Sequence, residues 1–300
     1  MSEAGTRGDA RARDDATRET LGASRGAGPT DQEWVDAFRR AAKAQREIFD
    51  RHQGIAARTE YEGIGEGGDR TLVIDRLCED AIFAELEGLH EAGHEFTVIS
   101  EERGTVSFGS PDAPLRVVAD PIDGSLNARR TMPCHSVSIA VADGTSMADV
   151  RLGYIYEFGA GEEFVAIAGS GATLDGAPIS VPAGDGLEVV GLEATKPERV
   201  LAAAQSLSGR AYRIRTPGSI AVSLCYVANG RFDGMISTRN CRSVDAAAGQ
   251  LIVQEAGGRV EFGGLELDGA DLDLSARYDV AAARTAADLQ TLREVQEQVP

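Results

Sequence analysis

The chain has 300 residues, of which 42% are hydrophobic, and this is enough for a large core shared between two lobes. Its formal net charge of -18 argues against nucleic acid or an anionic membrane as the main partner, because both would repel such a surface. No segment approaches the ~18 apolar residues needed to span a bilayer, and the N-terminal segment MSEAGTRGDARARDD has no apolar secretory core. We therefore expect a soluble cytoplasmic protein.

The basic residues are almost all arginine, since Lys43 and Lys196 are the only lysines. An excess of acids with so little lysine is typical of a chain adapted to high salt, where screening makes a large net charge tolerable. A GC-rich genome also favours arginine over lysine and is the alternative explanation.

The first half of the chain predicts a tail followed by helices and then by strands. Residues 1–30 lack apolar periodicity and predict a disordered tail. Helical spacing of apolar residues follows over 34–52 and 72–90, with a glycine-rich loop between the two helices. The strands that we expect next are FTVIS, LRVVAD, HSVSIAVAD and DVRLGYIYEF, followed by a hairpin-rich region over EEFVAIAG and ATLDGAPISV.

After about residue 185 predicted strands and helices alternate. The expected order is strand LEVVGLEA, helix PERVLAAAQSL, strand AYRIRT, helix SIAVSLCYVANG, strand FDGMIS, helix DAAAGQLIVQEAGG, a strand near RYDVAAA and helix TAADLQTLREVQEQ. We therefore predict an α+β N-terminal lobe over 31–184, which carries most of the metal ligands, and an α/β C-terminal lobe over 185–300, which completes the site.

The segment DPIDGS, residues 120–125, ends an apolar strand with two acids and a tight turn. Such a turn can aim the carboxylates of Asp120 and Asp123 and the carbonyl of Ile122 at one point. Oxygen ligands of this kind suit a hard cation such as Mg²⁺. Gly124 and Ser125 can then begin a short helix whose N–H groups and hydroxyl receive a phosphate oxygen. The alternative is an ordinary Asx-turn between two strands.

Three further acidic signals fall at the ends of predicted elements. Glu101 and Glu102 follow the strand FTVIS, Asp75 lies at the opening of a helix, and Asp245 begins a strongly apolar helix with a run of small residues behind it. A solvated loop explains the first signal equally well, and helix N-caps explain the other two. A functional interpretation requires that these acidic residues lie close together in the folded protein.

Together, and in this order, these segments resemble one family. GDRTLVID, SEERG, DPIDGSLN and SVDAAAGQLIVQEAGG resemble the motifs of the inositol monophosphatase superfamily. TRNCRSVDAAAG and RTPGS resemble its archaeal branch, which hydrolyses both fructose 1,6-bisphosphate and inositol phosphates. The resemblance covers about residues 32–298. It implies a layered αβαβα sandwich, the sugar phosphatase fold, and a Mg²⁺-dependent phosphomonoesterase in carbohydrate metabolism and gluconeogenesis.

The resemblance also implies roles for individual residues. The first Mg²⁺ would be held by Glu101, Asp120 and the Ile122 carbonyl, and the second by Asp120, Asp123 and Asp245. A third and weaker ion would lie near Glu101 and Asp75. Asp75 and Ser125 would orient the attacking water, and metal binding would bring the pKa of a water toward ~7. Gly124 and Ser125 would bind the phosphate of the substrate, and Gly218, Ser219 and Asp245 would face its hydroxyl groups. Asp123 would also belong to the substrate-binding residues.

The chain also departs from the family pattern. Thr238 stands where animal inositol phosphatases place a glutamate that contacts inositol, which weakens a strictly inositol-specific interpretation. Four arginines, Arg213, Arg215, Arg239 and Arg242, lie near the predicted substrate segments. We assign Arg215 and Arg239 to a second phosphate, as a bisphosphate substrate would require. Ion pairs with surface acids are the alternative.

The sequence also contains features that point to other functions. His90-Glu91-Ala92-Gly93-His94 matches the zinc protease pattern HExxH, but Gly93 places His94 beyond the last helical turn. The four scattered cysteines indicate buried thiols rather than zinc. A metal- or phosphate-binding regulatory protein would keep the fold without turnover. Other substrates of the superfamily, 3'-phosphoadenosine 5'-phosphate and histidinol phosphate, stay open. A homodimer is the family expectation.

Overall fold

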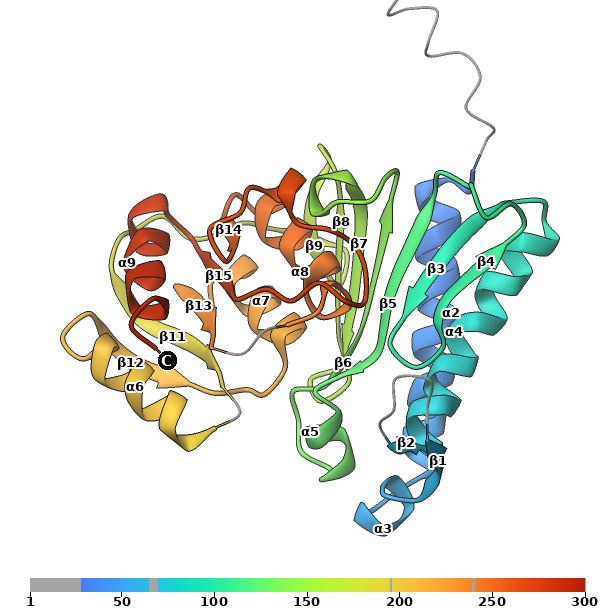
Figure 1. Ribbon diagram of the computed structural model, residues 1–300, viewed down its shortest axis with the longest axis horizontal. Coiled ribbons are helices and arrows are strands. Elements are labelled where there is room, and N and C mark those ends of the chain that lie inside the picture. The colour runs from blue at the N-terminus through green and yellow to red at the C-terminus, as the bar shows by residue number, and fades with distance from the viewer. Residues whose placement is uncertain (1–27, 65–69, 195, 239–240, 300) are drawn as a thin grey trace, which may run out of the picture.

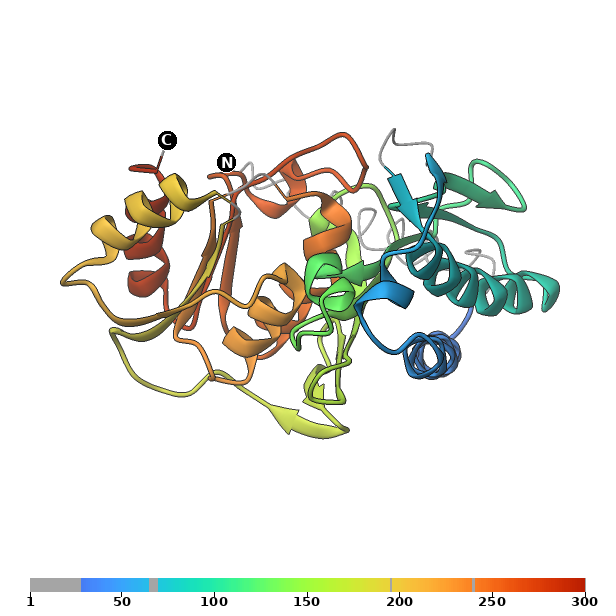
Figure 2. The same ribbon diagram turned by 90° about the horizontal axis from the view of Figure 1, so that it is seen from below.

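The protein is described by a computed structural model that covers residues 28–64, 70–194, 196–238 and 241–299. Its elements form five layers (Figure 1). Helices α6 (Pro197–Leu207) and α9 (Ala286–Gln296) cover the outer face of a five-stranded sheet. Helices α7 (Ile220–Ala228) and α8 (Ser243–Glu255) separate that sheet from an eight-stranded one. Helices α2 (Asp31–Arg51) and α4 (Val73–Glu91) cover the far side of the larger sheet, where they pack side by side (Figure 2).

The larger sheet has the strand order β10-β9-β8-β7-β6-β5-β3-β4. Its neighbours are antiparallel except for β3 and β5, which run parallel. The strands are β3 (Phe96–Ser100), β4 (Gly104–Phe108), β5 (Arg116–Asp123), β6 (Ser136–Ala142), β7 (Val150–Glu157), β8 (Glu162–Ile167), β9 (Gly171–Leu174) and β10 (Ala177–Ile179). Short elements lie around them: α3 (Ile55–Arg58), the hairpin β1 (Tyr61–Ile64) and β2 (Arg70–Leu72), α5 (Ser125–Arg129) and a 3-10 turn (Met147–Asp149).

The smaller sheet has the order β12-β11-β13-β15-β14. Strands β12, β11 and β13 run parallel to one another, and β15 is antiparallel to both of its neighbours. The strands are β11 (Leu187–Glu193), β12 (Ala211–Arg215), β13 (Gly234–Ser237), β14 (Arg259–Phe262) and β15 (Val280–Ala283), with a 3-10 turn (Leu267–Gly269) before the last. The central parallel strands end toward the functional site described below.

Apolar side chains fill each space between the layers. One buried cluster lies between the two sheets around α7 and α8, a second between the larger sheet and α2 and α4, and a third beneath α6 and α9. Helix α8 packs so tightly that a Cβ on Gly153 of β7 would lie 2.6 Å from the Ala248 carbonyl oxygen. The small residues Ala246 to Gly249 of α8 permit this approach, as the sequence predicted.

The layered α+β sandwich confirms the predicted fold class. The helices expected over 34–52 and 72–90 are α2 and α4, and the alternation expected after residue 185 is present. The features that were not predicted are β4, β14, the β1–β2 hairpin, α3 and the 3-10 turns at Met147–Asp149 and Leu267–Gly269. The tail was predicted over residues 1–30, and its residues 1–27 lie outside the described residues. The division of the chain into two lobes stays a prediction. None of the described helices is long and apolar enough to cross a bilayer.

Candidate metal and substrate site

The end of β5 turns sharply and presents two carboxylates. The pairing of β5 with β6 is irregular between Asp120 and Asp123. The Ile122 N–H donates to Asp120 Oδ1 at 2.9 Å, which closes an Asx-type turn around Pro121. Gly124 follows in the left-handed region with φ +88°, and a Cβ there would lie 2.7 Å from the Cys134 carbonyl oxygen. Glycine is therefore needed to turn the chain into α5.

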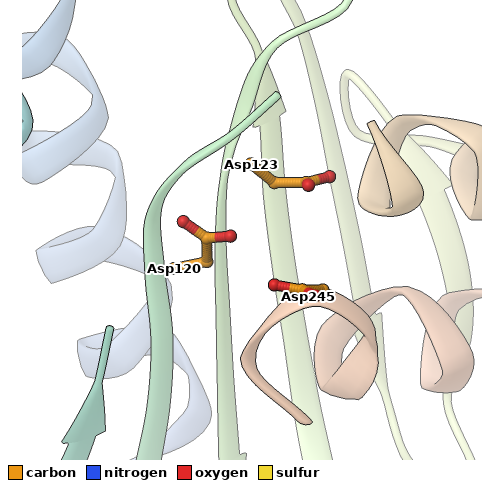
Figure 3. A group of neighbouring side chains, drawn as sticks. All are labelled: Asp120, Asp123 and Asp245. Carbon is orange, nitrogen blue, oxygen red and sulfur yellow. The ribbon is translucent and has the colours of Figure 1, made fainter. Parts of the chain in front are cut away.

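The carboxylates of Asp120, Asp123 and Asp245 point toward one another (Figure 3). One oxygen from each lies within 4.8 Å of the others, and all three residues are buried. Asp120 and Asp123 come from the β5 turn, whereas Asp245 comes from the first turn of α8. Residues 122 to 125 positions apart in the chain thus form one acidic cluster that could hold a metal ion.

Asp123 connects the β5 turn to the start of α7. Its Oδ2 atom accepts hydrogen bonds from the Ser219 hydroxyl at 2.5 Å and from the Ala221 N–H at 2.7 Å. Ser219 is the N-cap of α7, and its hydroxyl also accepts from the Val222 N–H. These bonds fix the orientation of the Asp123 carboxylate within the cluster.

Glu101 reaches the cluster from the turn between β3 and β4. Arg242, just before α8, forms an ion pair with Glu101 and lies 3.8 Å from Asp245 Oδ1. Burial raises the pKa of Glu101, and the nearby Arg242 charge partly offsets this rise. Buried Glu79 stabilises the same turn. Its Oε1 atom accepts a hydrogen bond from the Ser100 hydroxyl at 2.5 Å and another from the Arg103 N–H at 3.1 Å.

Asp75 lies in the first turn of α4, beside the same acids. It lines a small recess together with Glu101, Glu102, Asp120 and Ser125 among others. Its Oδ1 atom is buried and has no hydrogen-bond partner among the described residues. Burial, and then the charges of Glu102 and Glu101, raise the pKa of Asp75 to about 7.

The Ser125 hydroxyl donates to the Ile122 carbonyl at 2.8 Å. The pairing of Ser125 with Asp75 that the family resemblance implies would require this hydroxyl to rotate. A carbonyl oxygen has two lone pairs, so the Ile122 carbonyl can still accept a second partner.

The carboxylates of Glu101, Asp120, Asp123 and Asp245 line one cavity of about 380 Å³. The described residues that line it are Glu101, Asp120, Ile122, Asp123, Gly124, Ser125, Leu126, Asn127, Glu193, Ala194, Gly218, Arg242 and Asp245. Burial, and then the charges of Glu101, Asp123 and Asp245, raise the pKa of Asp120 well above its ordinary value. Clustered buried carboxylates and an unpartnered carboxylate oxygen fit divalent cations, which favour oxygen ligands and stabilise their charged form.

Arg215, one of the two arginines that we assigned to a second phosphate, is not among the described residues that line the acidic cavity. Arg215 lines a neighbouring cavity of about 490 Å³ together with Cys134 and Arg231 among others. The guanidinium group of Arg213 stacks over the Tyr212 ring, with its carbon 3.6 Å from the ring centroid. Arg239 lies outside the described residues. Of the three described arginines, Arg242 lines the acidic cavity.

Two residues of the cavity were missed in the sequence. Asn127 donates to the carbonyls of Cys134 and Pro217 at 2.9 and 2.7 Å, and it thereby joins the loops before β6 and α7. Glu193 ends β11 and is 2% exposed. The rule that identified Asp120, an acid closing an apolar strand, would also have found Glu193 in LEVVGLEA.

The HExxH pattern does not form a metal site in the described structure. Helix α4 ends at Glu91, and Gly93 has φ +100°, so His94 lies beyond the helix as predicted. The His90 ring nitrogen Nδ1 is bonded to the His94 carbonyl at 2.9 Å. Among the described residues, the group of three or more possible ligands is formed by Asp120, Asp123 and Asp245.

Comparisons with known proteins agree with this geometry. The sequence model of the inositol monophosphatase family matches residues 31–299. The fructose-1,6-bisphosphatase/inositol-1-monophosphatase of Methanothermobacter thermautotrophicus is 38% identical over 235 residues, which cover 73% of this chain and 81% of that protein. The protein of the same name from Thermococcus kodakarensis is 33% identical over 270 residues, with coverage of 89% and 98%.

The fold is also similar to that of solved structures. An inositol monophosphatase-fructose 1,6 bisphosphatase matches with a TM-score of 0.76 and 25% identity, and the match covers 87% of this chain and 99% of that one. The family model matches nearly all of the described chain, and the matched residues include the acidic cluster of Asp120, Asp123 and Asp245. The chain belongs to the inositol monophosphatase family and is a phosphatase.

Proposed function

We propose that this protein is a Mg²⁺-dependent phosphomonoesterase that hydrolyses fructose 1,6-bisphosphate, inositol monophosphate or both. The observation that carries the proposal is the buried convergence of Asp120, Asp123 and Asp245 from two distant parts of the chain. The names of the archaeal relatives support the two substrates.

The charge of the cavity supports the need for more than one cation. Among the described residues that line it, five are carboxylates and one is an arginine. An anionic phosphate ester would be repelled by this excess of four negative charges. Two divalent ions would neutralise it and a third would make the site positive, so we propose two to three Mg²⁺ ions for each site.

The ligand sets follow the positions of the acids. Asp120 would be shared between two ions, with Glu101 and the Ile122 carbonyl on one side and Asp123 and Asp245 on the other. Bound Mg²⁺ would supply positive charge that acidifies a water and stabilises the phosphoryl group as it is displaced. Asp75 and Ser125 would orient that water.

The substrate would lie between the β5 turn and the start of α7. The N–H groups of Gly124 and Ser125 would contact the phosphate, while Gly218, Ser219 and Asp245 would face the hydroxyl groups. Arg215 and Arg239 remain our candidates for a second phosphate. If so, Arg215→Ala should raise the KM for fructose 1,6-bisphosphate more than the KM for inositol 1-phosphate, and equal effects on both would remove the assignment.

A phosphate-release assay tests the proposed function. Protein treated with a chelator should release no phosphate, and added Mg²⁺ should restore release from fructose 1,6-bisphosphate, inositol 1-phosphate or both. The panel should include 3'-phosphoadenosine 5'-phosphate and histidinol phosphate, because family members differ in substrate. Failure to hydrolyse every sugar or cyclitol phosphate in excess Mg²⁺ would contradict the proposal and favour a binding protein.

Three properties of the whole protein are further proposals. The net charge of -18 and the scarcity of lysine support adaptation to high salt, so activity should rise with potassium chloride up to molar concentrations. A cytoplasmic location and a homodimer are the other two proposals, and the homodimer is the family expectation. Light scattering of the purified protein would test the dimer, and a monomer at micromolar concentration would contradict it.

A further inference from the structure

Arg242 is the only basic residue among the described residues that line the acidic cavity. It is the N-cap of α8, and hydrogen bonds hold its backbone on both sides. The Cys241 and Tyr278 backbones exchange two of these bonds, at 2.7 and 2.9 Å, and the Arg242 N–H donates to Asp245 Oδ2 at 2.9 Å. Such anchoring suits a side chain that binds a ligand at a fixed place.

The Arg242 guanidinium group contacts two acids through one of its nitrogens. Its Nη2 atom pairs with Glu101 and lies 3.8 Å from Asp245 Oδ1, and 29% of the side chain is exposed. A guanidinium group carries five N–H donors. Among the described residues, none accepts a hydrogen bond from its Nε or Nη1 atom. These donors can therefore bind an anion that enters the cavity.

We propose that Arg242 is a catalytic residue that donates hydrogen bonds to the oxygens of the ester phosphate, while its Nη2 atom stays beside Glu101. The planar guanidinium group matches the oxygens of a phosphate, and such charge-assisted bonds are stronger than those between neutral groups. A phosphoryl group that is being transferred spreads negative charge over its outer oxygens, so a fixed cation beside them lowers the barrier. The inference rests on the proposed phosphatase function and adds a residue that contacts the transferred group.

Two other roles for Arg242 predict different results. If the guanidinium group only orients Glu101 for a metal ion, excess Mg²⁺ would repair its loss. If it binds the second phosphate of a bisphosphate, its loss would affect bisphosphate esters alone. Contact with the ester phosphate predicts a loss that persists in saturating Mg²⁺ and is the same for mono- and bisphosphates. This loss extends to the binding of inorganic phosphate, the product that all these esters share.

The test compares wild type with Arg242→Met, which keeps an unbranched side chain and removes its charge. Calorimetry in saturating Mg²⁺ should show that the Kd for inorganic phosphate rises about tenfold, which corresponds to ~1.4 kcal/mol of binding. In the same Mg²⁺, kcat should fall ~100-fold for every ester that wild type hydrolyses. Arg210→Met is the matched control, because it removes the same charge from a surface ion pair with Glu294. Both of its values should stay within about twofold of wild type.

The outcomes separate the inference from the proposed function. Phosphate binding and kcat that reach wild-type values in excess Mg²⁺, or a loss confined to bisphosphates, would overturn the inference and leave the proposed function in place. A wild-type protein that hydrolyses no sugar or cyclitol phosphate would instead overturn the proposed function. If Arg242→Met does not fold, Arg242→Lys keeps the charge beside Glu101 but presents a single nitrogen, so the Kd for phosphate should still rise about threefold or more. An unchanged Kd in that variant would count against the inference.

Discussion

The buried Asp75 carboxylate should make the metal-free protein less stable as the pH rises. Burial, and then the charges of Glu102 and Glu101, raise its pKa from an ordinary 3.8 to about 7. The folded state therefore binds the proton more tightly than the unfolded chain, so the free energy of unfolding falls as pH rises between these two values. Above pH 7 the loss is complete.

The structure gives the size of this effect. At ~1.36 kcal/mol for each pH unit, the rise in pKa corresponds to ~4 kcal/mol of unfolding free energy. Asp75→Asn removes the titration at nearly constant shape. In the presence of a chelator, the variant should match wild type near pH 4 and become more stable by up to ~4 kcal/mol at pH 8, which is a rise in Tm of about 10 °C.

Thermal unfolding of both proteins at half-unit steps between pH 4 and 8.5 is the assay. The pKa values of Glu101 and Asp120 are also raised, and the difference between the two proteins cancels most of their contribution. Adding Mg²⁺ at pH 8 should stabilise wild type more than the variant, because only wild type offers the ionised carboxylate. Parallel stability curves, with a difference that does not change with pH, would refute the reasoning.

Other changes test the remaining contacts. Asp123→Asn should lower kcat by ~100-fold or more. In thermal unfolding with increasing Mg²⁺, this variant should also lose the stabilisation that Mg²⁺ gives to wild type. Glu157→Gln changes a buried acid elsewhere and should retain that stabilisation in the same experiment. Arg242→Met should strengthen Mg²⁺ binding by about tenfold, because the guanidinium group then no longer competes with Mg²⁺ for the Glu101 carboxylate. Calorimetry measures the affinity, and weaker binding by the variant would contradict this prediction. Gly124→Ala should lower the unfolding free energy by ~1–3 kcal/mol more than Gly54→Ala, since both have positive φ and only the former would meet a backbone oxygen. Equal losses in denaturant unfolding would refute the steric argument.

The long helices and most of the strands could be predicted from the sequence by itself. Helices α2 and α4 have long amphipathic patterns, and the central strands have continuous apolar runs that only burial on both faces explains. Of the strands that were missed, β4 and β14 each lie at one edge of a sheet, and β1 and β2 form a separate two-stranded sheet. Edge strands are only partly buried, so their apolar signal is weak.

The sequence also marked the acidic residues of the site, because DPIDGS places two carboxylates on one turn through local backbone geometry alone. Glu101, Asp75 and Asp245 were identified by family resemblance and by their places at element ends. Local patterns carry this information because each acid lies where a strand or helix begins or ends.

Only the tertiary structure decided which of these groups touch. The bonds from Ser219 and Ala221 to Asp123, and from Gly218 and Ser223 to Glu193, join residues 25 to 98 positions apart. The ion pair between Arg242 and Glu101 likewise joins the start of α8 to the turn between β3 and β4. Such contacts depend on how α7 and α8 pack between the sheets, and no spacing in the chain encodes that packing.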